Sequence, residues 1–135
     1  MKLLAFFRQH KRTVVYAIAI ISLSLLAGAY VGVTYCKKMI HANAFALWAR
    51  GMESFHDGQY DQAMFYYTQA VALKNDEPVF VLSVAETYEA KKDVATAIVF
   101  YEAAVEKYKE LKMEGKIKSI EKRIEKLRIP KGVSP

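Results

Sequence analysis

Apolar residues form one uninterrupted run near the N-terminus. Residues 13–35 contain no charged side chain over 23 positions, TVVYAIAIISLSLLAGAYVGVTY. A helix needs about 20 apolar residues to cross a bilayer, and core helices of soluble proteins rarely lack a polar face over six turns. The pattern predicts a transmembrane helix over residues 13–35, followed by a juxtamembrane linker over residues 36–43.

Basic residues precede this segment. Residues 1–12 carry four bases and no acid, a net of +4: Lys2, Arg8, Lys11 and Arg12. The end of a transmembrane helix that is richer in Lys and Arg usually lies on the cytoplasmic side. The sequence therefore predicts a cytoplasmic leader, a single-pass protein of the inner (plasma) membrane, and a C-terminal part in the periplasm or another extracytoplasmic space.

The same N-terminal segment also has features of a secretory signal peptide. Ala27, Gly28 and Ala29 are small residues of the kind that precede a cleavage site. The apolar sequence continues for six residues beyond them, which favours a retained anchor. Cleavage after Ala29 would instead make the chain a secreted protein, and this alternative stays open.

Three small residues in the apolar segment recur every fourth position. Ser24, Gly28 and Gly32 therefore share one face of the predicted helix. Small residues let membrane helices approach each other closely, and Gly28 with Gly32 forms a GxxxG pair. We expect this face to pack against another membrane helix. Because the segment contains no ionisable residue, the pattern argues against an ion or proton pathway.

The remainder of the chain repeats with a period of about 34 residues. Displacement by one period superimposes four pairs of identical residues between the two repeats: Ala63 and Ala97, Tyr67 and Tyr101, Ala70 and Ala104, Val71 and Val105. A small residue also recurs three times: Gly51, Ala85 and Ser119. Small residues allow close crossing of antiparallel helices, so the pattern predicts helices at about 43–57, 60–74, 77–91, 94–111 and 113–128.

Turn and cap residues separate these helices. Asp57 and Gly58 predict a turn after the first of them. The stretch from Asn75 to Pro78 offers a cap and an early proline for the third, and Asp93 offers a cap for the fourth.

The period and its fixed positions resemble the tetratricopeptide repeat family. Matching residues are Gly51, Gly58, Tyr60, Ala63, Tyr67 and Ala70 in the first repeat, and Ala85, Tyr88, Ala97, Tyr101 and Ala104 in the second. The resemblance implies an all-α fold after the membrane helix. Its expected parts are a first repeat over 44–77, a second over 78–111, a capping helix over 112–129 and a flexible tail over 130–135.

The resemblance also implies where a partner binds. Members of this family hold peptides or partner helices in a concave groove lined by the first helix of each repeat. The corresponding residues here are Phe45, Trp48, Met52, Phe55, His56, Leu82, Glu86 and Glu89. Aromatic residues and Met are common in binding hot spots and adaptable grooves. The alternative is that the aromatic residues pack against the linker or the juxtamembrane helix.

Charge divides the C-terminal part into two regions. Residues 36–106 carry six bases and ten acids, a net of −4, whereas residues 107–131 carry ten bases and four acids, a net of +6. Bases of the predicted capping helix are candidates to meet an acidic partner or an anionic lipid: Lys116, Lys122, Arg123 and Lys126. The alternative is a solvated face with Glu–Lys pairs. Nucleic acid is disfavoured, because no aromatic residues alternate with these bases.

The sequence offers little catalytic chemistry. It contains no HExxH, GxSxG, phosphate-loop or EF-hand pattern, and the single Cys36 has no evident base beside it. We therefore predict a protein that is not an enzyme and needs no cofactor or metal. The leading hypothesis is a membrane-anchored scaffold or accessory subunit that contacts other subunits of a membrane or cell-envelope complex. A peptide-binding receptor or chaperone-like module and a secreted repeat protein are the alternatives.

Overall fold

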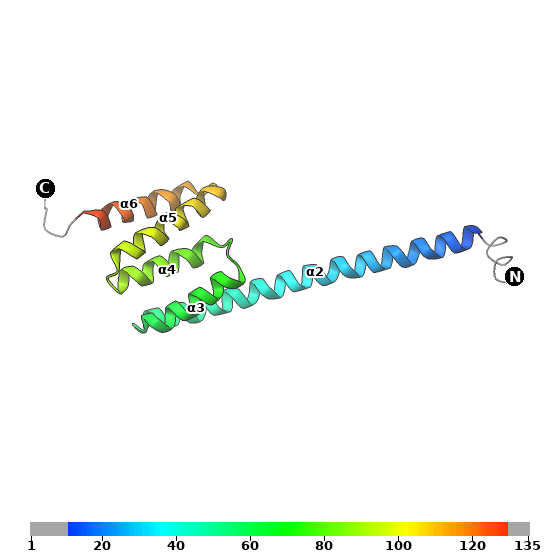
Figure 1. The fold of residues 1–135 in the computed structure, drawn as a ribbon, viewed down its shortest axis with the longest axis horizontal. Helices are drawn as coiled ribbons and strands as arrows, with labels where there is room; N and C mark the ends of the chain where they lie inside the picture. Colours follow the sequence, from blue (N-terminus) through cyan, green and yellow to red (C-terminus); the bar gives the residue numbers. More distant parts are fainter. Residues whose placement is uncertain (1–10, 130–135) are drawn as a thin grey trace. The chain divides into compact units, whose positions relative to one another are not determined.

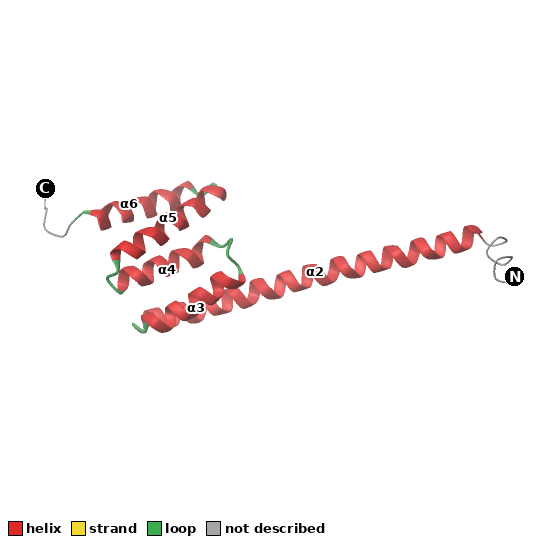
Figure 2. Ribbon diagram, viewed as in Figure 1, coloured by secondary structure: helices red, strands yellow, loops and turns green. Residues whose placement is uncertain are grey.

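The computed structural model describes residues 11–129, and within this range the chain forms helices joined by short turns, without strands. The predicted tail at 130–135 and residues 1–10 of the predicted leader lie outside the described residues. Figures 1 and 2 show five helices: α2 (Lys11–His56), α3 (Tyr60–Leu73), α4 (Pro78–Ala90), α5 (Val94–Glu110) and α6 (Glu114–Arg128). The predicted all-α fold is confirmed for this range.

The predicted linker at residues 36–43 is not an irregular segment, because α2 continues through it to His56. This stretch contains neither Pro nor Gly, the two residues that most strongly disfavour a helix. By its internal contacts the chain divides into two compact units, residues 1–39 and residues 40–135. The helix α2 contributes to both units.

The described part of the N-terminal unit is the apolar portion of α2. Its large side chains have little cover, and Val15, Leu25 and Tyr30 are 63%, 70% and 73% exposed. The hydroxyl of Thr34 donates a hydrogen bond to the carbonyl of Val31, 2.8 Å away, which satisfies it inside the helix. This helix has the length and composition to cross a membrane, features that it shares with a signal sequence.

The C-terminal unit begins with a very close contact between α2 and α3. A Cβ added to Gly51 would lie 2.5 Å from Cε1 of Tyr67, too close for any side chain without movement of the ring. One period later, Ala85 of α4 and Tyr101 of α5 are both buried in one apolar cluster. The small and aromatic positions of the repeat therefore mark the crossings between paired helices. Ser119, the third small position, is exposed.

The turns follow the same period. Gly58 and Lys92, which are one period apart, both have a left-handed backbone, with φ of 75° and 65°. Asp93 caps α5 as predicted, because its Oδ1 accepts a hydrogen bond of 3.2 Å from the Thr96 amide. The cap predicted before α4 is wrong. Glu77 occupies that position without a side-chain capping bond, and its carboxylate instead pairs with Lys74.

The last helix packs on the preceding repeat through its apolar stripe. Ile120 and Ile124 of α6 are buried in the cluster that contains Tyr101 and Tyr108 of α5, and Ile117 and Leu127 flank them. An amphipathic helix that covers the end of a stack needs such a stripe on one side only. The apolar pattern of residues 114–128 thus accounts for the position of α6 against α5.

Candidate partner-binding groove

Three helices of the C-terminal unit contribute side chains that are one repeat period apart in the sequence. Phe55 comes from the end of α2, Glu89 from α4 and Arg123 from α6. Phe55, Glu89 and Arg123 border one hollow of about 310 Å³, together with Glu86 and Ala90. The repeat therefore brings residues from three helices to one concave site, which we call the groove.

Glu89 and Arg123 form the firmest contact in the groove. The Nε and Nη2 atoms of Arg123 donate to Oε2 and Oε1 of Glu89 at 2.8 and 2.9 Å. Such a two-point contact fixes the plane of the guanidinium as well as its distance. The hydroxyl of Tyr101, from α5, donates to Oε2 of Glu89 at 2.6 Å. One carboxylate thus connects α4 with both α5 and α6.

The electrostatics of this cluster favour the ionised pair. Burial opposes the charge on Glu89, but the hydrogen bonds from Arg123 and Tyr101 outweigh burial and lower its pKa. The pKa of Tyr101 is raised, first by burial and then by its hydrogen bond to Glu89. The hydrogen bond to Glu89 also raises the pKa of Arg123. All three groups therefore keep their ordinary protonation states at neutral pH.

Glu86 lies one helical turn before Glu89 and has a different environment. Its side chain is exposed, yet desolvation of the carboxylate raises its pKa, with a further contribution from the like charge of Glu89. Arg123 and Lys116 partly offset this effect. Because the guanidinium of Arg123 is already bound to Glu89, the carboxylate of Glu86 is the groove's available acceptor. It suits an amine, guanidinium or amide donor of a partner.

The aromatic residues at the start of the predicted groove face the core. The ring centroid of Phe45 lies 4.9 Å from that of Phe80, which is fully buried in α4. Trp48 also contacts Phe80, and its Nε1 donates a hydrogen bond of 2.8 Å to the hydroxyl of Ser83. Both residues are half-buried. They pack α2 against α4, which is neither the linker contact nor the open binding surface that the sequence suggested.

The other predicted groove residues divide between the core and the surface. Met52 and Leu82 are half-buried and pack against the core clusters. His56 is exposed next to Phe55, with ring centroids 6.2 Å apart. Of the eight residues predicted for the groove, Phe55, Glu86 and Glu89 border its hollow.

The bases predicted on the last helix lie partly in the groove and partly on the exposed surface. Arg123 is part of the groove through its pair with Glu89. The other three, Lys116, Lys122 and Lys126, are exposed on α6. Only Lys116 of these three influences the groove, through its charge near Glu86. A contact of these lysines with an acidic partner or lipid stays a prediction.

Sequence reasoning did not identify the bond from Tyr101 to Glu89 or the pairing of Glu89 with Arg123. The spacing of one full period between Glu89 and Arg123 was the available signal, since residues one period apart stand side by side in a stack of repeats. Within the described residues there is no group of three or more His, Cys, Asp or Glu side chains placed to hold a metal ion. The arrangement is a hollow bordered by one fixed ion pair and by the carboxylate of Glu86, which stands outside that pair.

The comparison with protein families agrees with this arrangement. A family model described as tetratricopeptide repeat matches residues 46–77. Residues 46–77 are thus a tetratricopeptide repeat. The matched residues comprise the end of α2, all of α3 and the connection to α4. Comparisons with curated proteins and with solved structures give no significant match. Tetratricopeptide repeats are protein-interaction modules, so the chain has a module for binding other proteins.

Proposed function

We propose that this tetratricopeptide repeat protein is a non-catalytic, membrane-anchored scaffold or accessory subunit. It mediates contacts between proteins within a membrane or cell-envelope complex. The supporting observation is the dual nature of α2. The apolar residues of its N-terminal portion are exposed, and its last residues form the first helix of a repeat. One helix thus joins a hydrophobic anchor to an interaction module.

In this proposal residues 13–35 cross the membrane once. The four bases in residues 1–12 keep the N-terminus in the cytoplasm, and the repeats stand on the periplasmic or extracytoplasmic side. Gly28 and Gly32 provide a contact for a second membrane helix, because space around both glycines is open within 4 Å. A membrane-protein partner would then have contacts both in the bilayer and at the groove.

The groove is the proposed contact for the soluble part of that partner. Phe55 offers an aromatic side chain, and Glu86 offers the available carboxylate. A partner segment with an apolar side chain next to a Lys or Arg fits both features. The ion pair between Glu89 and Arg123 holds these two side chains of the groove in fixed positions.

The experiment that tests this function is mild-detergent extraction of the full chain from membranes, followed by quantitative mass spectrometry. A subunit is expected in the membrane fraction, with its N-terminus intact and a partner at a constant stoichiometric ratio. Protease added outside intact spheroplasts should digest the repeats. Recovery of the chain alone, together with peptide binding that depends on Phe55, would contradict the subunit role in favour of a peptide receptor. A mature N-terminus after Ala29 would contradict the anchor in favour of a secreted protein.

A further inference from the structure

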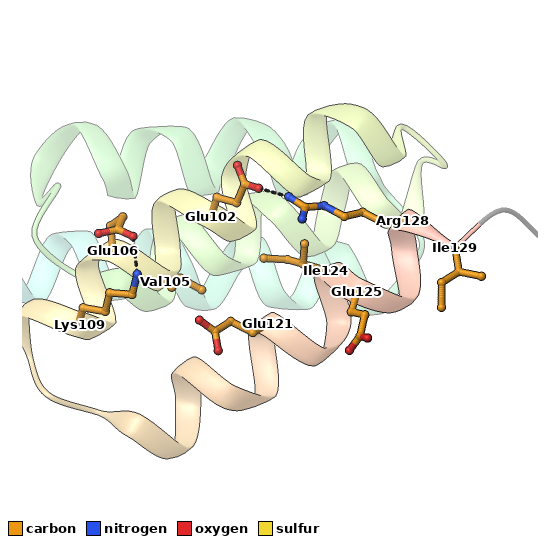
Figure 3. A pocket seen from close by; sticks show the side chains of 9 residues that line it. All are labelled: Glu102, Val105, Glu106, Lys109, Glu121, Ile124, Glu125, Arg128 and Ile129. Atoms are coloured by element: carbon orange, nitrogen blue, oxygen red, sulfur yellow. Dashed lines mark hydrogen bonds and ion pairs between the residues drawn. The ribbon is translucent and has the colours of Figure 1, made fainter.

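A second groove lies between α5 and α6 and shares no residue with the hollow beside Glu86. Figure 3 shows the side chains that line it. Its volume is about 630 Å³, about twice that of the hollow beside Glu86. We call it the α5–α6 groove. Its apolar surface is formed by Val105 of α5 with Ile124 and Ile129 at the C-terminal end of the described chain.

The floor of this groove continues the protein's own core. Val105 and Ile124 both belong to the apolar cluster beneath α6 and are only 5% and 7% exposed. Ile129 is 53% exposed at one end of the groove. An apolar side chain that entered the groove would therefore extend an existing core and cover Ile129.

The rim of the α5–α6 groove is acidic, in contrast to the basic sequence around it. It contains four glutamates: Glu102, Glu106, Glu121 and Glu125. The two bases at the rim are already paired, Arg128 with Glu102 at 2.5 Å and Lys109 with Glu106 at 2.7 Å. Among residues 13–129, Glu121 and Glu125 form no ion pair with any base. These two carboxylates are therefore available to the bases of a partner.

The junction of α3 and α4, one repeat earlier in the stack, shows which side chains pack at such a position. There, Phe100 of α5 packs against the cluster that contains Tyr67 of α3 and Val84 of α4, so an apolar side chain of the next helix reaches the junction of α3 and α4. The junction of α5 and α6 follows it in the stack, and within residues 11–129 no further helix covers it. The open junction is therefore a candidate position for an additional helix.

We propose that the α5–α6 groove binds an amphipathic helix of a partner protein whose apolar stripe is flanked by Lys or Arg. The apolar floor receives the stripe, and Glu121 and Glu125 pair with the bases. This binding does not depend on the hollow beside Glu86, so the two surfaces can be occupied together.

A second copy of the chain fits this groove less well than such a partner. The apolar residues of α6 are already packed against α5, which leaves its exposed lysines without an apolar stripe. The helix α3 exposes Phe65, but it contains neither Lys nor Arg. The occupant must supply both features on one helix.

The test uses the full chain in a non-ionic detergent and a synthetic helix of about 15 residues, with Leu on one stripe and Lys on both sides of it. A carbodiimide couples carboxylates to lysine amines in direct contact, and mass spectrometry locates the links. We expect links at Glu121 and Glu125. The double variant E121Q/E125Q should bind the helix about tenfold more weakly at low salt, and I129S should also weaken it.

The matched control is E110Q/E114Q, which removes two exposed acids of the same helices outside the groove. Its affinity for the helix should equal that of the wild type. Links spread equally over Glu110, Glu114 and the groove would overturn the proposal, as would unchanged affinity in E121Q/E125Q or equal binding of a probe with Glu in place of Lys. Links from Glu121 to a second copy of the chain, with the probe excluded, would show self-association instead.

Discussion

The guanidinium of Arg123 contacts the carboxylate of Glu89 at two points, across one period of the repeat. Glu89 is mostly covered and Arg123 is half-exposed, so solvent weakens their attraction. A double-mutant cycle with E89Q and R123A should give a coupling free energy of about 1 kcal/mol. Urea unfolding of the full chain in detergent, followed by the fluorescence of its single tryptophan, Trp48, measures it.

The exposed pair of Glu102 and Arg128 is the control for that cycle. Both side chains are more than half-exposed, at 52% and 61%, and they make a single hydrogen bond. Their coupling should be close to zero. Equal coupling in the two cycles would show that the shape of the groove does not depend on the contact between Glu89 and Arg123.

Glu86 and Glu89 should shift stability in opposite directions as the pH changes. The pKa of Glu86 is raised above its ordinary value of 4.5. Its stabilising contribution is therefore complete below that value and is lost as the pH rises through its raised pKa. The pKa of Glu89 is lowered, so its contribution is present above 4.5 and is lost as the pH falls through the lowered pKa.

The variant E86Q isolates the first of these effects. At neutral pH it should be at least as stable as the wild type, and its advantage in the free energy of unfolding should grow as the pH rises from about 4.5 to 7. Carbon-13 NMR of the glutamate carboxyls should show Glu86 titrating at a higher pH than Glu89. The reverse order would contradict the assigned environments.

Gly51 should tolerate no larger residue. In G51A the new Cβ meets the ring of Tyr67, which is 2% exposed and has little room to move. We expect a loss of about 1–3 kcal/mol in the free energy of unfolding. Gly115 of α6 is the matched control, because an added Cβ there meets nothing within 4 Å. G115A should be neutral or stabilising by up to about 1 kcal/mol.

The hydrogen bond from Trp48 to Ser83 should stabilise the crossing of α2 and α4. S83A removes the acceptor and leaves the half-buried indole N–H unpaired, at an expected cost of about 1 kcal/mol. The emission of Trp48 should change with it. T68A removes an exposed hydroxyl that bonds only within its own helix, so it should leave both stability and emission unchanged. Identical stability of S83A and the wild type would argue that Trp48 is a surface residue.

Local patterns predicted most of the fold. The positions where paired helices cross could be predicted, because close packing permits few residue types there. Small residues recur at Gly51 and Ala85, and tyrosines at Tyr67 and Tyr101. Asp93 identified the start of α5. The expected start of a separate helix near residue 43 differs from the structure, in which α2 runs through residues 36–43. A change from apolar to polar sequence marks a change of surroundings and does not by itself end a helix.

The groove was predicted less completely, since family positions indicate a helix but not the direction of each side chain. Phe45 and Trp48 turn toward Phe80 because α4 presents a large apolar surface there. Glu86 and Glu89, one turn apart, have different surroundings: Glu89 accepts hydrogen bonds from Arg123 and Tyr101, whereas Arg123 acts on Glu86 through its charge. Such distinctions arise from contacts between repeats and have no local signature in the sequence.

The central claim is that the groove of a membrane-anchored repeat holds a protein partner. Its most direct measurement is the molar ratio of co-purified partner to the chain in mild-detergent extracts of membranes, compared between wild type, E86K and the control E110K. We predict a constant ratio for wild type and E110K, and a ratio reduced by about tenfold or more in E86K, because a base replaces the available carboxylate. An equal ratio in all three proteins, or a chain found outside the membrane fraction, would contradict the account.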